Sequence, residues 1–513
     1  MKNILKFITI IALAMLVSCN QDIVERNELY PQLNPSNPDA TAGTWRTLLL
    51  TAPDEFALDA PIAAANAAFT REINEIKSYQ ANITPEQREI VVYWSVGGIL
   101  RWNEIMQTLV ARHNRPPYQN PDGTYPAPSA ANPFANPNFP FSNPPYAARA
   151  YAYVSAAQYD ALVAAWHFKK LYNRAAPYTV DTNLQVMLPK STLPSYPSED
   201  GVMAGVTVEL LKLLFPTEIA FIQQKADEQK LSRIISGANV RSDVEAGIIL
   251  GRKIAAKFIA KAATDGAGAA IGTPAIWAAL ETNTAATGQI PWKSLDLPPR
   301  PPMLPLFGNV KSFLMTPADV VANRPPPPPS TGSAQFLAEL AEVKSYSNNN
   351  NREQMRIVSF WADGVGTYTP PGHWNAIANG IFVEQNFSEV RWARNMALLN
   401  LTMMDAAITC WDAKYFYFNP RPCQIDPSIK TLTGTPNFPS YVSGHSTFSG
   451  AAATFLSHIV PSKANEVQAM ANQASVSRLF GCIHYKSDID AGMTLGKKCG
   501  NFAVQRALSD GAN

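Results

Sequence analysis

The stretch Phe438-Pro-Ser-Tyr-Val-Ser443-Gly444-His445 lies at the centre of three short runs that decide how the whole chain is interpreted. The run before it is Lys414-Tyr-Phe-Tyr-Phe-Asn-Pro-Arg421-Pro422, and the run after it is Ser477-Arg478-Leu-Phe-Gly-Cys-Ile-His484-Tyr-Lys-Ser-Asp488. Their functional groups are basic side chains, two histidines, a serine hydroxyl, a glycine amide and a carboxylate. This inventory fits the binding of a tetrahedral oxyanion such as phosphate or vanadate.

The basic residues supply the charge that such an anion needs. A phosphate or vanadate is buried only if its charge is offset, and Lys414, Arg421 and Arg478 suffice for that. The forked donors of arginine match two oxygens of a tetrahedral anion, whereas lysine acts as a point charge. The Ser443-Gly444 step precedes an apolar helical stretch, so it predicts a helix N-terminus with free amides for the anion.

The two histidines are suited to proton transfer and ligation. His445 follows the predicted anion-binding turn directly, which places it over the anion. His484 and Asp488 are four residues apart, so they share one face if a helix has begun there. A carboxylate that holds one imidazole nitrogen fixes the tautomer and leaves the other nitrogen free as a nucleophile or ligand.

The order Lys-x6-Arg-Pro, Ser-Gly-His, Ser-Arg-x5-His-x3-Asp resembles the signature shared by phosphatases of the type 2 phosphatidic acid phosphatase (PAP2) superfamily and the vanadium-dependent haloperoxidases. The match covers residues 414–488, and its second run looks closer to the haloperoxidase branch. Val442 departs from the family, which usually has proline before Ser-Gly-His. The segment Phe360–Ala378 is also similar to one in exported bacterial haloperoxidase-like proteins; its Asp363 and His373 either line the cavity mouth or serve the structure of a loop.

The resemblance implies a role for each residue of the runs. His484 would bind vanadium axially, or attack phosphorus in a phosphatase, and Asp488 would orient it. His445 would be the acid–base group, taking a proton from hydrogen peroxide or protonating a leaving alcohol. Lys414 would also polarise peroxide toward a halide. The anion's equatorial oxygens would be held by Lys414, Arg421, Arg478, Ser443 and the amide of Gly444.

Two aromatic residues bear on the choice between these branches. Trp411 lies one helical turn before Lys414, so both side chains can point into the site. Phe438 precedes His445 by seven residues, where the family places a residue that touches the halide pocket. Both are therefore candidates for a halide pocket, and the alternative is that both are ordinary core aromatics.

The predicted function is a vanadate-dependent haloperoxidase, which oxidises halide with hydrogen peroxide to hypohalous acid. The alternative is an exported acid phosphatase that acts on a phosphomonoester through a phosphohistidine and needs no vanadate. A third interpretation is a lipoprotein that binds oxyanions without turnover. The chain carries a net charge of only +2, so a nucleic-acid partner is not expected. Helical bundles of this size often form homodimers.

Helical periodicity predicts an all-α bundle with long proline-rich loops. Thr84, Pro85 and Gln87 form a predicted capping box that opens a helix running to about His113. No internal repeat is expected, Gln119–Pro145 is predicted to be an irregular loop, and Pro325–Pro329 a polyproline II connector. The other predicted helices span residues 147–172, 202–214, 240–263, 334–346, 388–411, 446–459, 462–479 and 487–508.

The N-terminus predicts an exported lipoprotein. Basic residues precede a short apolar run that ends in Leu16-Val17-Ser18-Cys19, the pattern of a signal peptide with lipidation at Cys19. The expected organisation is a signal peptide (1–18), a tether and irregular N-terminal segment (19–59) and one helical domain (60–513) with its core at about 380–510. The protein would be anchored to a bacterial membrane only through this lipid.

The remaining cysteines lie in the C-terminal quarter of the chain: Cys410, Cys423, Cys482 and Cys499. Four cysteines allow three pairings, between which the sequence does not choose. Disulfides near the site and buried free thiols both remain open at this point.

Overall fold

The structure is a computed structural model that describes residues 30–115, 120–122 and 143–512. The chain divides after Pro31, and residues 32–513 form one compact unit. The described residues contain helices and no strands, which confirms the predicted all-α class. The signal peptide, Cys19 and most of the loop expected at 119–145 lie outside the described residues. No helix of the described part is long and apolar enough to cross a membrane.

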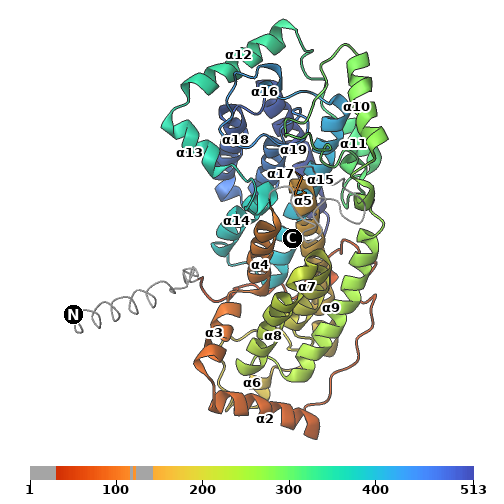
Figure 1. Cartoon of the computed structure of the whole chain (residues 1–513). Coiled ribbons are helices and arrows are strands. Elements are labelled where there is room, and N and C mark those ends of the chain that lie inside the picture. Colours follow the sequence, from red (N-terminus) through yellow and green to blue (C-terminus); the bar gives the residue numbers. More distant parts are fainter. Residues whose placement is uncertain (1–29, 116–119, 123–142, 513) are drawn as a thin grey trace, which may run out of the picture. The chain divides into compact units, whose positions relative to one another are not determined.

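The helices are joined by loops (Figure 1), and several of these loops are rich in proline. In chain order they are α2 (Ala67–Ala81), α3 (Pro85–Trp94), α4 (Gly98–His113), α5 (Pro144–Tyr172), α6 (Pro177–Val180), α7 (Glu199–Leu214), α8 (Ile219–Ile235), α9 (Arg241–Ala262), α10 (Pro274–Ala286), α11 (Pro317–Asn323), α12 (Ala334–Asn349), α13 (Arg352–Phe360), α14 (Thr369–Val383), α15 (Glu389–Tyr417), α16 (Pro422–Ile425), α17 (Gly444–Ile459), α18 (Ala464–Phe480) and α19 (Lys486–Ala507).

The predicted helix from residue 84 to 113 is wrong in one respect. The capping box of Thr84 and Gln87 is present, but α3 ends at Trp94 and α4 begins only at Gly98. Gly97 has a φ of 111°, a conformation that L side chains rarely adopt, and it interrupts the helix. The amide of Ile99 in the new first turn donates to the buried Glu389 carboxylate over 2.7 Å.

Two other differences from the predicted helices affect the site. Helix α15 continues to Tyr417 and not to residue 411, so Lys414 belongs to its last turn. Helix α14, which has Pro370 and Pro371 in its first turn, was not predicted. Prolines are tolerated in the first turn of a helix, where no amide hydrogen is needed for the backbone ladder. Helices α8, α10 and α13 were not predicted either.

The chain contains an internal duplication, so the expectation of no repeat was wrong. Helices α5, α6, α7, α8 and α9 recur as α15, α16, α17, α18 and α19 with the same lengths. A constant shift of 245, the difference between residues 144 and 389, relates the two copies. The sequence signal was short: Pro194-Ser-Tyr-Pro-Ser198 corresponds to Pro439-Ser-Tyr-Val-Ser443. The intervening residues have diverged, and a period of this length differs from the short repeats of solenoid proteins.

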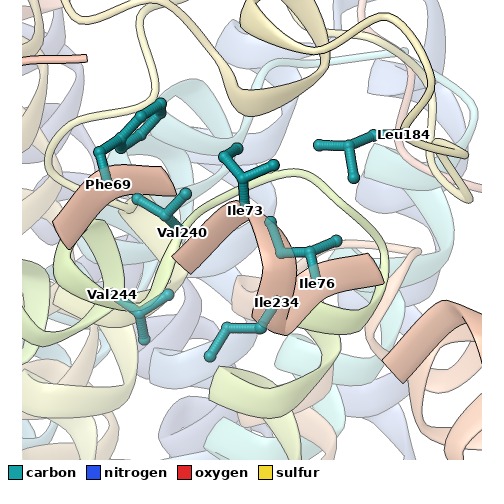
Figure 2. Packing of buried hydrophobic residues seen from close by; sticks show 7 residues of the cluster. All are labelled: Phe69, Ile73, Ile76, Leu184, Ile234, Val240 and Val244. Atoms are coloured by element: carbon teal, nitrogen blue, oxygen red, sulfur yellow. The ribbon is translucent and has the colours of Figure 1, made fainter. Parts of the chain in front are cut away.

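The two copies share their stabilising contacts as well as their helices. Arg149 pairs with Asp265 at 2.6 Å, and at the corresponding positions Arg394 pairs with Asp510 at 2.8 Å. One further helix, which precedes the copy in the chain, packs on equivalent residues of each copy. Helix α2 packs Phe69, Ile73 and Ile76 on the first copy (Figure 2), and α12 packs Phe336 and Val343 on the second. The fold is therefore two related helical bundles, joined through contacts between α5 and α15.

Within each bundle one pair of helices packs backbone to backbone. A Cβ atom built on Gly496 of α19 would lie 2.1 Å from the carbonyl oxygen of Thr447 in α17. The same position of the first copy, Gly251 of α9, would meet the carbonyl oxygen of Val202 at 2.2 Å. Glycine is required at both positions because no side chain fits between the helices.

The segment before α2 is mostly irregular, yet it belongs to the compact unit from Gln32 onward. The buried Asp160 carboxylate accepts the amides of Leu48, Leu49 and Leu50 at 2.6–2.9 Å. These hydrogen bonds attach residues 48–50 of the irregular segment to helix α5. Cys410, Cys423, Cys482 and Cys499 are free thiols, which resolves the open question of their pairing.

Candidate functional site

The ends of several helices of the second bundle place the residues of the three runs together. Lys414 lies in the last turn of α15, Arg421 precedes α16, and Ser443 caps α17. Arg478 lies near the end of α18, and His484 immediately precedes α19. The structure thus brings the predicted anion-binding residues to one region, because these helices start or stop at the same end of the bundle.

A cavity of about 480 Å³ opens at this region. Its walls include Gly444, His445, Arg478 and His484. Lys414, Arg421 and Ser443 lie just behind these walls. The amino group of Lys414 is 4.9 Å from the ring centre of the lining residue Phe438, and Arg421 Nη1 is 3.0 Å from His484 Nε2.

The basic residues of the site are buried without a compensating carboxylate. The side chains of Lys414, Arg421 and Arg478 are at most 1% exposed. Among the described residues, no carboxylate lies within ion-pair distance of any of the three. Burial lowers the pKa of Lys414 and brings the pKa values of Arg421 and Arg478 to about 10. Asp488 and Asp363 interact with these cations only beyond ion-pair distance, and three buried cations without a direct ion pair favour the binding of an anion.

Backbone carbonyls hold the cations in place. The amino group of Lys414 donates to the carbonyl oxygens of Pro439 and Ser440 at 2.7 and 2.9 Å. Arg421 Nε and Nη1 donate to the carbonyls of Phe438 and Ile483, whereas its Nη2 is buried without a hydrogen-bond partner. This unused donor fits an oxyanion oxygen in the cavity.

His484 has one defined tautomer. Its Nδ1 lies 2.9 Å from Asp488 Oδ2, and its Nε2 lies 3.0 Å from Arg421 Nη1, which is only a donor. Nε2 therefore carries the lone pair, and Nδ1 donates its proton to Asp488. Burial, followed by the charge of Arg421, lowers the pKa of His484 well below the usual value. The neutral ring presents a nucleophilic or ligating nitrogen beside the cations.

Ser440 supports the same carboxylate and was not identified from the sequence as a site residue. Its hydroxyl donates to Asp488 Oδ2 at 2.5 Å. The amide of Tyr485 donates to the same oxygen at 3.1 Å, which closes the capping box of α19. Burial raises the pKa of Asp488 to about 6, in opposition to these hydrogen bonds.

His445 faces a second carboxylate, Asp363. His445 Nε2 lies 3.4 Å from Asp363 Oδ2, and His373 Nδ1 lies 2.9 Å from Asp363 Oδ1. His373 stacks on Trp361 with ring centres 4.5 Å apart, which positions the carboxylate. Burial and the charge of Arg478 lower the pKa of His445 to about 4. The sequence places Asp363 near the site only through the resemblance of its segment; nothing in the spacing links it to His445.

Trp411 and Phe438 form an aromatic wall of the cavity. Their ring centres are 5.0 Å apart, both rings are buried, and both line the cavity. Trp411 Nε1 donates to the carbonyl oxygen of Met303 at 3.2 Å, which leaves the apolar part of the indole toward the cavity side chains. These residues therefore contribute to the core and also to the surface that a small ligand would meet.

Comparison with known proteins identifies both the motif region and the fold. Residues 395–507 match the PAP2 superfamily. The structure is similar to the first bacterial vanadium-dependent iodoperoxidase, with a TM-score of 0.58, 21% identity, and coverage of 83% of this chain and 97% of that chain. It is also similar to a holo-type bacterial vanadium-dependent chloroperoxidase, with a TM-score of 0.51, 14% identity, and coverage of 72% and 93%.

No curated protein matches the sequence. The structural likeness spans both bundles, whereas the motif region alone accounts for the superfamily match. The segment 395–507 is therefore a member of the PAP2 superfamily, within a chain that has the fold of the vanadium haloperoxidases.

Proposed function

We propose that the protein is a vanadate-dependent haloperoxidase, which converts hydrogen peroxide, a halide and a proton into hypohalous acid and water. The observation that carries this proposal is the buried group of Lys414, Arg421 and Arg478, which forms no direct ion pair among the described residues and adjoins the lone pair of His484. An aromatic wall beside it suits a large, weakly hydrated halide. The fold shared with vanadium-dependent iodoperoxidase and chloroperoxidase also supports it.

Vanadate, when bound, would supply a Lewis acid that activates hydrogen peroxide toward a halide. His484 Nε2 would be its protein ligand, with Asp488 and Ser440 fixing the ring. Its oxygens would be held by Lys414, Arg421, Arg478, Ser443 and the amide of Gly444. A Cβ on Gly444 would come within 4.0 Å of Phe448 and Trp411, so the absence of a side chain keeps the backbone open to the cavity.

His445 would act as the base that accepts a proton from hydrogen peroxide. With a pKa of about 4 its ring is neutral at physiological pH, as a base must be. The adjacent Asp363, whose pKa is about 2, stays ionised and stabilises the imidazolium once the proton has been taken up. Lys414, held by two carbonyls, would polarise the peroxide oxygens.

The variant Asp363→Asn is expected to shift the acid side of the pH profile downward. The carboxylate raises the pKa of His445, so its removal lowers that pKa by about one unit. Because the base must be neutral, kcat/KM would then begin to fall at a lower pH than in the wild type. Peroxidase kinetics between pH 3 and 7 measure the position of this acid limb. The control is Glu353→Gln, which removes an exposed ion pair with Arg356. An acid limb that stays in place would argue against the role of Asp363.

The proposed activity is tested with purified protein loaded with orthovanadate. We expect peroxide-dependent oxidation of iodide or bromide, followed by triiodide absorbance or bromination of a dye. Protein that retains vanadate but oxidises no halide would rule out the proposal. The same assay, run with iodide, bromide and chloride in turn, shows which halide the protein oxidises.

A soluble acid phosphatase is the second candidate, and it rests on the geometry of His484. A neutral imidazole whose lone pair faces buried cations also suits attack on a phosphomonoester, with His445 as general acid for the leaving alcohol. Hydrolysis of p-nitrophenyl phosphate by the vanadate-free protein, inhibited by vanadate, would favour this function over the first.

The third candidate, an oxyanion-binding lipoprotein without turnover, is distinguished by one substitution. A protein that only binds has no need of the His445–Asp363 pair. The variant His445→Ala should keep its vanadate affinity within a few fold under every hypothesis, but it should lose turnover only if the protein is an enzyme. Equilibrium dialysis and the peroxidase assay on the same preparation separate the two.

We also propose that the protein is exported and anchored to a membrane through lipid on Cys19. The signal-like N-terminus supports this location, and the cationic site does not depend on it. The variant Cys19→Ala should move the protein from the membrane fraction to the soluble fraction. Unchanged fractionation together with an unmodified N-terminal mass would refute the lipid anchor.

A further inference from the structure

A second, smaller cavity of about 130 Å³ lies in the first bundle. It is lined by Lys169, Arg233, Glu199, Asp200 and Asn239, among others. Under the shift of 245, these positions correspond to Lys414, Arg478, Gly444, His445 and His484, in that order. The duplication has therefore produced a second cavity at the place equivalent to the proposed oxyanion site.

Part of the anion-binding framework is retained in this second cavity. Lys169 donates to the carbonyl oxygen of Pro194 at 2.6 Å, as Lys414 does to Pro439 at 2.7 Å. The amide of Ser198 donates to the carbonyl oxygen of Asp243 at 3.0 Å, and the amide of Ser443 donates in the same way to Asp488. These shared contacts place the two lysines and the two helix starts equivalently in the two bundles.

An arginine is retained as well. Arg233 Nε donates to the hydroxyl of Ser232 at 3.3 Å, and Arg478 Nε donates to the hydroxyl of Ser477 at 2.9 Å. The serine and the arginine are thus the same residue types at the same places in both copies. The first bundle keeps two of the three cations of the proposed oxyanion site.

The remaining positions have changed in a way that removes ligation and proton transfer. Ala176 stands where the second bundle has Arg421, and Asn239 where it has His484. Asn239 Nδ2 donates to the carbonyl oxygen of Ser195 at 2.9 Å, so its amide is used in the backbone structure. Because Asn239 and Asp200 stand at the positions of His484 and His445, this cavity lacks the two imidazoles that would ligate the oxyanion and transfer protons in the second bundle.

The helix start carries the most informative change. Glu199 and Asp200 stand at the positions of Gly444 and His445, and each carboxylate contacts one of the two retained cations. Lys169 Nζ lies 2.7 Å from Glu199 Oε2, and Arg233 Nε lies 3.2 Å from Asp200 Oδ2. Gln229 also donates to Asp200 Oδ1 at 2.8 Å. Each of these two cations therefore has a carboxylate within ion-pair distance, whereas no carboxylate of the described residues lies that close to a cation of the second bundle's site.

We propose that the second cavity is a duplicate oxyanion site in which the carboxylates of Glu199 and Asp200 take the place of the anion. The chain therefore binds an oxyanion in the second bundle alone, and the first bundle holds a closed copy. Removal of the two carboxylates opens this copy to a tetrahedral oxyanion such as phosphate, which binds there without turnover. This proposal does not depend on which reaction the second bundle performs.

A third carboxyl group lies on the wall of the second cavity, and its burial disfavours its ionised form. Glu389 lines the second cavity and accepts the amide of Ile99. Burial is the largest cause of its raised pKa, followed by the charge of Asp200, which the double variant removes. The burial remains in that variant and still disfavours the ionised form of Glu389, which limits the negative charge that it adds beside Lys169 and Arg233.

The test is a calorimetric titration of the full chain with inorganic phosphate at pH 7. The variant Glu199→Gly/Asp200→Asn copies the glycine of the second bundle and keeps an acceptor for Gln229. We expect it to bind one more phosphate per chain than the wild type, and the further change Lys169→Met to remove that added site. Glu209→Gln, on the surface of the same helix, is the matched control and should bind as the wild type does.

Two results would overturn the proposal. One is a folded double variant, by circular dichroism, whose phosphate stoichiometry equals that of the wild type. The other is a wild-type chain that loses one phosphate on the change Lys169→Met, because the natural cavity would then already hold an anion.

A milder variant covers the case in which the double variant does not fold. Glu199→Gln leaves Lys169 without its counter-charge, so its melting temperature should fall below that of the wild type. Added phosphate should raise this temperature more than it raises that of the wild type, since binding to the folded state stabilises it. An equal rise in both proteins would count against an anion site in the first bundle.

Discussion

Replacing His484 with alanine is expected to reduce vanadate-supported halide oxidation at least about a thousandfold, the scale of losing a residue that the chemistry requires. His484 Nε2 is the nitrogen whose lone pair adjoins Arg421 and the cavity, and Asp488 fixes the tautomer that exposes it. Alanine removes that ligand and leaves Lys414, Arg421 and Arg478 in place. The anion should therefore bind more weakly, through charge alone.

Two measurements on the same variant test this expectation. Equilibrium dialysis of orthovanadate should show an affinity at least about tenfold lower, and the peroxidase assay should show the loss of turnover. His458→Ala is the matched control, because His458 lies at the other end of α17, away from the cavity lining. A His484→Ala protein that keeps wild-type vanadate affinity and substantial activity would show that this nitrogen is no ligand.

The change Gly496→Val is expected to destabilise the protein by about 3 kcal/mol or more, or to prevent folding. A Cβ at this position would lie 2.1 Å from the carbonyl oxygen of Thr447 and 2.9 Å from the amide nitrogen of Ala451. Both atoms belong to the backbone of α17, so no side chain can move aside. Helices α17 and α19 would have to separate, and every contact between them would weaken.

Urea denaturation followed by circular dichroism measures the effect. Gly380→Ala is the control: it is also a glycine within a helix, but no atom lies within 4 Å of the added Cβ. Alanine favours helix over glycine by about 0.5–1 kcal/mol, so this control should be slightly stabilised. A Gly496→Val protein as stable as the wild type would mean that the two helices are not in backbone contact.

The same packing also controls the geometry of the site. Ser443 caps α17 and donates its amide to the carbonyl of Asp488, while the Asp488 side chain holds His484. If α17 and α19 separate, the anion-binding turn moves away from the histidine. A partly folded Gly496→Val protein should therefore lose vanadate binding along with stability.

Local features of the fold could be predicted where the determinant is itself local. The capping box at Thr84 and Gln87 depends on residues three apart, and the structure contains it. The long helices follow from periodic apolar positions. The break at Gly97 and the extension of α15 to Tyr417 were missed, because helix ends depend on tertiary contacts such as the Glu389–Ile99 hydrogen bond.

By itself the sequence determined the helical class and singled out Lys414, Arg421, His445 and His484, because residue type and order along the chain suffice for both. Only the tertiary structure decided which carboxylate serves His445, since Asp363 reaches it from a segment distant in sequence. It also decided that the site's cations are buried without a direct ion pair among the described residues, while their counterparts in the first bundle are paired. Desolvation and pairing depend on which atoms surround a charge after folding, and those neighbours come from helices that the sequence does not place beside one another.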